Sequence, residues 1–187
     1  FCLSGPDVML YQLGRPDRYL LPYYWADIAK GDLTREEALE LIDCLGLMYN
    51  EYIPTGLASG LMVGGRDENG RDVSNELTRL FIESIGRVRM IYPGVGLCLT
   101  PDTPADVLQL SVEMLGRGCS HPALFNDNLI IEGLRRYGLP YRDACHYIHS
   151  TCVEITPATC SATWVASPYT NLPQLLLDTL GIKPSGS

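Results

Sequence analysis

The chain has 187 residues, of which 46% are hydrophobic and 19% are charged, a composition typical of a globular protein that folds in water. Its 14 Lys and Arg residues and 22 Asp and Glu residues give a formal net charge of −8, which argues against binding to nucleic acid or to an anionic membrane surface. The longest nearly uncharged stretch, residues 52–65, contains Pro54 and four glycines and therefore cannot form a membrane-spanning helix.

The seven cysteines are odd in number and irregularly spaced, which indicates free thiols rather than a disulfide framework. We therefore expect a reducing compartment and a cytoplasmic location. The first residues, Phe1-Cys2-Leu3, show neither an initiator Met nor a signal peptide, so we expect the chain to begin inside a longer protein. Residues 183–187 are interpreted as a tail or linker after a single domain covering residues 1–182.

Two helices are predicted in the first half of the chain. Thr34 and Glu37 form a capping box that begins a helix over residues 34–52. Its predicted apolar stripe consists of Ala38, Leu41, Ile42, Leu45 and Met48. The second helix is predicted over residues 72–90, with an apolar side at Val73, Leu77, Leu80, Phe81, Ile85 and Val88. Residues 63–70 between them contain glycines but no phosphate-binding motif, and are interpreted as a loop.

Strands alternate with helices in the second half. The predicted strands cover residues 95–99, 121–125 and, as a strand or an extended loop, 148–155. The predicted helices cover residues 103–118, with Pro104 at the first helical position, 127–137, 140–147 and 171–180. This alternation indicates an α/β fold. Three or four visible strands are too few for a closed eight-unit barrel, so we expect part of a larger barrel.

Residues 145–154, Cys-His-Tyr-Ile-His-Ser-Thr-Cys-Val-Glu, form the densest cluster of reactive side chains. Cys145, His149 and Cys152 are acceptable zinc ligands by type, although no paired CxxC or HxxxH motif accompanies them. Alternatively, Cys152 is a thiolate nucleophile with His149 as its base, although no orienting Asn or Asp is evident. A third interpretation is that these residues only pack in the core.

Glu154 favours a catalytic role for this cluster. Side chains two residues apart in an extended segment point to the same face, so Cys152 and Glu154 would project together, one able to transfer a hydrogen atom and the other a proton. Burying a carboxylate is costly unless it is partnered or protonated, and such a pair indicates a function. We therefore expect both side chains to face one enclosed cavity at a strand or loop tip.

Six short segments in the same order make the sequence resemble the glycyl radical enzymes, the pyruvate formate-lyase-like family, over about residues 12–180. They are residues 13–19 (Leu-Gly-Arg-Pro-Asp-Arg-Tyr), 33–38 (Leu-Thr-Arg-Glu-Glu-Ala), 74–78 (Ser-Asn-Glu-Leu-Thr), 122–127 (Pro-Ala-Leu-Phe-Asn-Asp), 142–144 (Arg-Asp-Ala) and 152–154 (Cys-Val-Glu).

The resemblance implies a ten-stranded α/β barrel with a cysteine at the tip of an internal loop. A glycyl radical on a separate C-terminal segment would convert that cysteine, here Cys152, into a thiyl radical, and Glu154 matches the general base of the dehydratase and lyase branch. The resemblance also implies a small-molecule substrate, a radical S-adenosylmethionine activating enzyme as partner, a homodimer and oxygen sensitivity. No metal in this chain, no nucleic acid and no membrane are expected.

The sequence departs from the family pattern at several positions. Thr151 stands where the family usually has Gly, and Val153 follows Cys152 where pyruvate formate-lyase has a second cysteine, which argues against formate and acetyl transfer. No Arg-Val-x-Gly-Tyr glycyl radical motif occurs in these residues, so we expect the chain alone to be inactive. Trp164 and Tyr169 are candidate substrate-binding residues, or core residues.

Several alternatives to a radical dehydratase or eliminase stay open. Within the family they are a formate-lyase-type acyltransferase and an arylacetate-type decarboxylase. Outside it they are a cysteine-dependent hydrolase and a non-catalytic fragment. If the chain is a segment of a larger barrel, we expect six leucine and phenylalanine side chains to lie partly inside the fold while other apolar surface stays uncovered. They are Leu41, Leu45, Leu77, Phe81, Leu108 and Leu115.

Overall fold

A computed structural model describes residues 10–52, 58–150, 154–158, 160 and 172–181. The strands in this part of the chain are β1 (Leu10–Gln12), β2 (Ala58–Gly64), β3 (Gly94–Leu99), β4 (Ala123–Asn126), β5 (Tyr147–Ser150) and β6 (Glu154–Pro157). The helices are α1 (Pro16–Tyr19), α2 (Leu21–Lys30), α3 (Arg35–Tyr52), α4 (Glu76–Val88), α5 (Ala105–Gly116), α6 (Asp127–Arg136), α7 (Tyr141–Ala144) and α8 (Leu172–Thr179).

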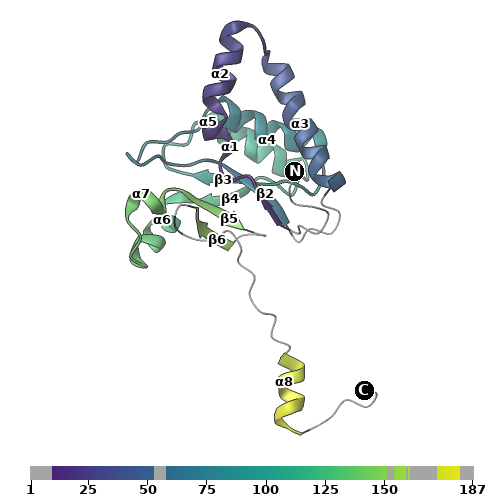
Figure 1. Cartoon of the computed structure of the whole chain (residues 1–187), viewed down its shortest axis with the longest axis vertical. Coiled ribbons are helices and arrows are strands. Elements are labelled where there is room, and N and C mark those ends of the chain that lie inside the picture. The colour runs from purple at the N-terminus through teal and green to yellow at the C-terminus, as the bar shows by residue number, and fades with distance from the viewer. Residues whose placement is uncertain (1–9, 53–57, 151–153, 159, 161–171, 182–187) are drawn as a thin grey trace.

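The four strands β1 to β4 form a parallel sheet in the order β1-β2-β3-β4, and β5 and β6 form a separate antiparallel pair. Helices connect the successive parallel strands, as parallel pairing requires. Helices α3, α4 and α5 lie on one face of the sheet, and β5 and β6 lie on the other (Figure 1). The predicted α/β class is confirmed.

Both faces of the central strands are buried, each in its own apolar core. On the helical face, Leu61 and Val63 of β2 and Val95 and Leu97 of β3 pack against α2, α3, α4 and α5. On the opposite face, Met62 and Cys98 pack with residues of β4, α6, α7 and β5. The alternation of side chains along a strand separates the two sets. The sheet is therefore a middle layer. β5 packs on the face opposite to helices α3, α4 and α5.

The predicted capping box of α3 is present. The Thr34 backbone N–H donates to Glu37 Oε2 at 2.8 Å, and the Glu37 N–H donates to Thr34 Oγ1 at 3.2 Å. The predicted stripe is partly wrong, because Leu41 is 63% exposed and Met48 is 41% exposed. The buried face instead includes Leu39 and Tyr49. Leu39 and Tyr49 lie one residue away from positions of the predicted stripe. Ala38 and Ile42, which belong to that stripe, do face the core.

Helix α4 begins at Glu76, four residues later than predicted. Asn75 is its N-cap: the side-chain Oδ1 accepts from the Leu77 N–H, and the Asn75 N–H donates to Thr78 Oγ1. The predicted first residue, Asp72, instead accepts a hydrogen bond from the Thr100 hydroxyl at 2.7 Å. The apolar side is confirmed at Leu77, Leu80 and Phe81, which are buried.

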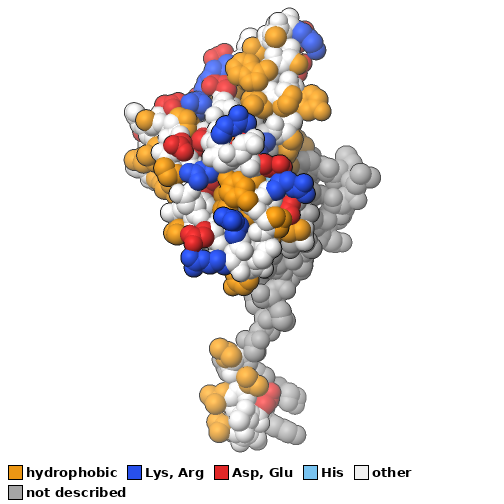
Figure 2. Space-filling view, turned by 90° about the vertical axis from the view of Figure 1, so that its left-hand side faces the viewer, with side chains coloured by type: hydrophobic (Ala, Val, Ile, Leu, Met, Phe, Trp, Pro, Cys, Tyr) orange, Lys and Arg blue, Asp and Glu red, His pale blue; other side chains and the backbone are white. Residues whose placement is uncertain are grey.

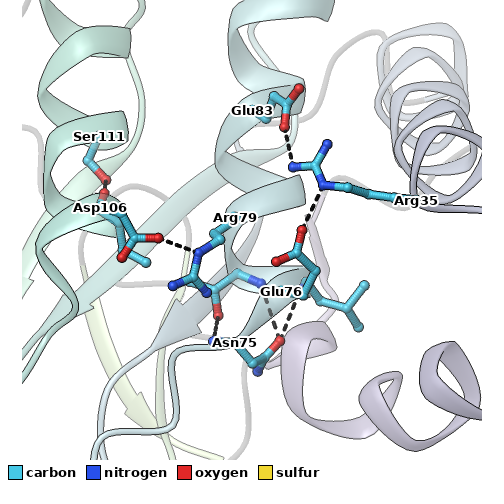
Figure 3. Close-up of polar contacts among 10 residues, drawn as sticks. Arg35, Asn75, Glu76, Arg79, Glu83, Asp106 and Ser111 are labelled. Atoms are coloured by element: carbon cyan, nitrogen blue, oxygen red, sulfur yellow. Dashed lines mark hydrogen bonds and ion pairs between the residues drawn. The ribbon is translucent and has the colours of Figure 1, made fainter.

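Ion pairs connect α4 to the helices on either side of it (Figure 3). Arg35 at the start of α3 donates to Glu76 at 2.7 Å and to Glu83 at 2.8 Å. Arg79 donates to Asp106 in the first turn of α5 at 2.6 Å. These contacts raise the pKa of Arg35 and lower that of Asp106. The three helices are therefore fixed to one another by polar contacts as well as by the core.

Several boundaries expected from the sequence are wrong. The described part of the chain has six strands rather than three or four, because β1 and β2 were not predicted, and residues 63–64 belong to β2 rather than to a loop. Of the helix predicted over residues 140–147, only α7 is helical. The segment predicted over residues 148–155 contributes residues 148–150 to β5 and residues 154–155 to β6. Pro104 precedes α5 as its N-cap. Leu108 and Leu115 are exposed, whereas Leu45, Leu77 and Phe81 lie in or against the core.

No helix in the described ranges is both long enough and apolar enough to span a bilayer.

Candidate active site

In the sequence, β5 precedes Cys152 and β6 begins at Glu154. His149 pairs with Ile155 and Ser150 pairs with Glu154, so Glu154 is the first residue of β6. The Glu154 side chain is exposed within the 187 residues. Cys152, Trp164 and Tyr169 lie outside the described residues. The expectation that Cys152 and Glu154 face one cavity therefore stays a prediction.

β5 lies against β2 through contacts of His149. The imidazole Nε2 lies 3.1 Å from the Leu61 carbonyl oxygen, and the backbone N–H of His149 donates to Met62 Sδ at 2.9 Å. The ring also stacks on Phe125 of β4, with centroids 5.5 Å apart. His149 is 3% exposed. These contacts fix the strand that runs directly into residues 151–153.

Arg15 holds the other end of β5. Its Nε and Nη2 donate to the Tyr147 carbonyl oxygen at 3.1 and 2.8 Å, and Nη1 donates to the Gly64 carbonyl oxygen at 2.9 Å. The guanidinium also lies 4.9 Å from the centre of the Tyr147 ring. One buried side chain therefore joins the C-terminal end of β2 to the first residue of β5. Sequence reasoning gave Arg15 no role, although it stands in the segment 13–19 that carried the family resemblance.

Two carboxylates are buried beside Arg15. Asp17 Oδ2 accepts from the Gly64 N–H at 2.7 Å and from the Thr78 hydroxyl at 2.8 Å. Burial raises the pKa of Asp17, and these hydrogen bonds lower it by less. Burial likewise raises the pKa of Asp127, the first residue of α6, against the lowering effect of Tyr147 and Arg15. Both side chains are inaccessible to solvent, and we assign them structural roles.

The other two histidines, His121 and His146, lie in different surroundings. His146 Nε2 lies 3.2 Å from Glu68 Oε1, and His146 Nδ1 lies 3.4 Å from Arg18 Nη1. His121 lies beside the cavity between α3 and α4, and burial lowers its pKa.

The zinc interpretation depends on Cys152, which the structure does not describe. Among the residues that are described, no group of three or more His, Cys, Asp and Glu side chains could hold a metal ion. The Cys145 thiol is buried and lies 3.2 Å from the Arg142 carbonyl oxygen. Burial raises the pKa of the Cys145 and Cys98 thiols, so both are expected to react slowly.

Residues 9–182 match the family model described as pyruvate formate lyase-like, and the chain belongs to this family, as the resemblance implied. It is 33% identical over 178 residues to the (2S)-3-sulfopropanediol dehydratase of Klebsiella oxytoca, with 87% of this chain and 21% of that protein covered. It is 30% identical over 154 residues to the isethionate sulfite-lyase of Nitratidesulfovibrio vulgaris, with 75% and 19% covered.

Among solved structures, a glycyl radical enzyme from Archaeoglobus fulgidus is similar to the chain with a TM-score of 0.74 and 31% sequence identity. That match covers 79% of this chain and 21% of the other. The chain thus spans about a fifth of the length of the relatives it matches. Its parallel sheet, with helices α3, α4 and α5 on one face, is part of the α/β barrel of glycyl radical enzymes, as predicted.

Proposed function

We propose that these residues form the part of a glycyl radical lyase that carries its thiyl cysteine, Cys152, and its general base, Glu154. The observation that carries the proposal is where the Cys-Val-Glu segment falls in a chain of this family: residues 152 and 153 stand in the sequence between β5 and β6, and Glu154 begins β6. Both strands lie on the sheet face away from helices α3, α4 and α5. In a barrel whose helices lie outside, that face is the interior. A cysteine between β5 and β6 is therefore near the space where a substrate can be enclosed.

The family's radical group resides on a glycine of a segment that we place outside these 187 residues. When present, that group supplies an unpaired electron by taking the hydrogen atom of the Cys152 thiol.

In the reaction, Cys152 transfers a hydrogen atom and Glu154 transfers a proton. Cys152, as a thiyl radical, takes a hydrogen atom from a substrate carbon that bears a hydroxyl, which leaves a carbon radical and restores the S–H bond. The hydroxyl of that radical is more acidic than that of the substrate, and Glu154 accepts its proton. The neighbouring substituent departs with the electrons of its bond and, when it is a hydroxyl, takes the proton held on Glu154 and leaves as water. The Cys152 thiol then returns the hydrogen atom to the product radical, which restores the thiyl radical.

We propose a small polar substrate with a hydroxyl next to the leaving group, which is water or another heteroatom group. The apolar residues around β5, among them Met62, Phe125 and Ile148, suit a site from which water must be excluded. Trp164 and Tyr169 are proposed to line the substrate. The proposal includes a cytoplasmic homodimer, activation by a radical S-adenosylmethionine enzyme and no metal in this part of the protein.

The test uses the full-length enzyme that contains these residues, after radical installation. Cys152→Ala is expected to abolish lyase turnover while the glycyl radical signal in electron paramagnetic resonance is retained. Glu154→Gln is expected to lower kcat by about 10²–10⁴-fold, the usual contribution of a general base. Cys160→Ala removes an exposed thiol eight residues away and serves as the matched control with unchanged turnover. Turnover by Cys152→Ala at the control's rate would refute the proposal.

A further inference from the structure

His149 lies flat on a surface that only glycine can provide. A Cβ added at Gly60 would lie 2.5 Å from His149 Cε1, and one added at Gly96 would lie 3.2 Å from His149 Cδ2. Real Cβ atoms do not approach other atoms to 2.5 Å, so the imidazole occupies the space of the missing Gly60 side chain. Two neighbouring strands, β2 and β3, together form this surface for one residue of β5.

The hydrogen bond of the ring fixes its direction within that space. Nε2 faces the Leu61 carbonyl oxygen, which only accepts, so Nε2 carries the hydrogen and donates it. The stacked Phe125 ring, tilted by 23°, covers the imidazole from β4. The side chain therefore has one rotamer and one tautomer, and its backbone has one position relative to the sheet. The hydrogen bond from the His149 backbone N–H to Met62 Sδ also holds the backbone in that position.

We propose that His149 is a positioning residue for the radical chemistry: it fixes the end of β5 on the sheet and so sets where Cys152, three residues later, meets the substrate. This inference rests on the proposed role of Cys152. Hydrogen-atom transfer needs the sulfur and the substrate carbon in near contact, and a misplacement of about 1 Å costs on the order of 10²-fold in rate. The contribution of His149 is thus expected in the chemical step and not in substrate binding.

Two substitutions separate the hydrogen bond of His149 from its ring. His149→Phe keeps an aromatic ring beside Phe125 but leaves the Leu61 carbonyl without its donor. His149→Gln loses the ring and keeps an amide N–H that can reach the same carbonyl. His146→Phe is the matched control, because His146 is a half-buried histidine of the same segment that contacts Glu68 and Arg18 instead of the sheet.

In the full-length enzyme, kcat is measured per installed glycyl radical, together with KM. His149→Phe is expected to lower kcat by about tenfold to a hundredfold with KM unchanged, and His149→Gln to stay within about threefold of the parent. His146→Phe is expected to match the parent. A kcat for His149→Phe within about twofold of the parent, or equal losses in kcat for both His149 variants and the control, would overturn the inference.

If His149→Phe does not accept the radical, amide hydrogen exchange of that protein decides the question. Faster exchange confined to β5 and β6 supports the inference, whereas faster exchange across β2 and β3 as well shows a general loss of folding and refutes a specific role. Failure of the proposed function itself looks different, because it appears as full turnover by Cys152→Ala whatever the His149 variants do.

Discussion

Asp127 is a buried acid whose pKa lies above its ordinary value because burial disfavours the carboxylate. The folded chain therefore holds a proton on this group at pH values where the unfolded chain has released it. The stabilising contribution of that proton is complete at low pH and is lost as the pH rises through the folded-state pKa. The fold is therefore weaker above this pH window than below it.

Asp127→Asn is expected to stabilise the chain relative to the parent at pH 7.5, and to do so by less at pH 5. The measurement is urea unfolding at both pH values. Asp106→Asn is the matched control at the start of another helix, where the Arg79 ion pair lowers the pKa of the acid. It is expected to give no stabilisation. A stability gain for Asp127→Asn that grows toward pH 5 would contradict the assignment.

The ionisation state of Cys152 separates the radical interpretation from that of a cysteine hydrolase. Hydrogen-atom transfer uses the neutral thiol, and a neighbouring carboxylate such as Glu154 disfavours the thiolate. We therefore expect iodoacetamide at pH 6 to alkylate Cys152 slowly, at no more than the rate of the exposed Cys160. The sites are compared by mass spectrometry of the digested protein. Alkylation of Cys152 at the rate of a cysteine protease nucleophile would favour the hydrolase.

The residues around the candidate site could be predicted from the sequence only in part. Cys152 and Glu154 are candidates because they form a short local motif in the sequence. Arg15 and His149 could not be given their roles, because each acts on partners far along the chain: Arg15 and Tyr147 are 132 residues apart, and His149 and Leu61 are 88 apart. Only the fold brings these groups together.

At the level of elements, helices α3, α4, α5 and α6 were predictable because each has an apolar face and a recognisable start. β2 was missed because Ala58–Gly64 is rich in glycine and small residues and is buried on both faces, which removes the alternation of a half-exposed strand. α2 was missed because the exposed aromatic residues Tyr23 and Trp25 flank Tyr24 and obscure the stripe of Leu21, Tyr24 and Ile28 that faces the core. The predicted apolar stripe of α3 was displaced from the buried face because Leu41 and Met48 are apolar but exposed.

The N-terminus of α4 tests which contacts hold the helical layer in place (Figure 3). Asn75→Ala removes a side chain that accepts from Leu77 N–H and donates to the Asp17 and Val73 carbonyl oxygens. We expect it to lower the free energy of unfolding by about 1–2 kcal/mol. Arg35→Met is the comparison, because it breaks two ion pairs that are partly exposed and is expected to cost less than about 1 kcal/mol.

Both variants are compared by urea unfolding, and Thr34→Ala, at the more exposed capping box of α3, provides a third value. The expected order of destabilisation is Asn75→Ala, then Thr34→Ala and Arg35→Met. A larger loss for Arg35→Met than for Asn75→Ala would show that the ion pairs between α3 and α4, rather than the helix cap, fix this layer.

At the scale of the whole molecule, the described residues leave a large amount of apolar surface uncovered. The aromatic side chains of α2 are prominent, with Tyr23 69% and Trp25 51% exposed, and Leu41, Leu47 and Met48 are exposed on α3. α8 exposes Leu172, Leu175 and Leu176. Hydrophobic side chains gather at the projecting end of α2 and α3 and on α8 (Figure 2). Soluble monomers rarely leave contiguous patches beyond a few hundred Å² uncovered.

We expect the 187-residue chain, purified alone, to self-associate despite its net charge of −8, because charge repulsion is weaker than the gain from covering this surface. Sedimentation velocity over a range of concentrations is the measurement. Tyr23→Lys combined with Trp25→Lys is expected to reduce association, whereas Tyr137→Lys, at a single aromatic residue that is 88% exposed at the end of α6, is expected to leave it unchanged. A monomer at all concentrations that melts in one cooperative transition would show that the exposed surface needs no partner, and that this part of the barrel is stable without the rest.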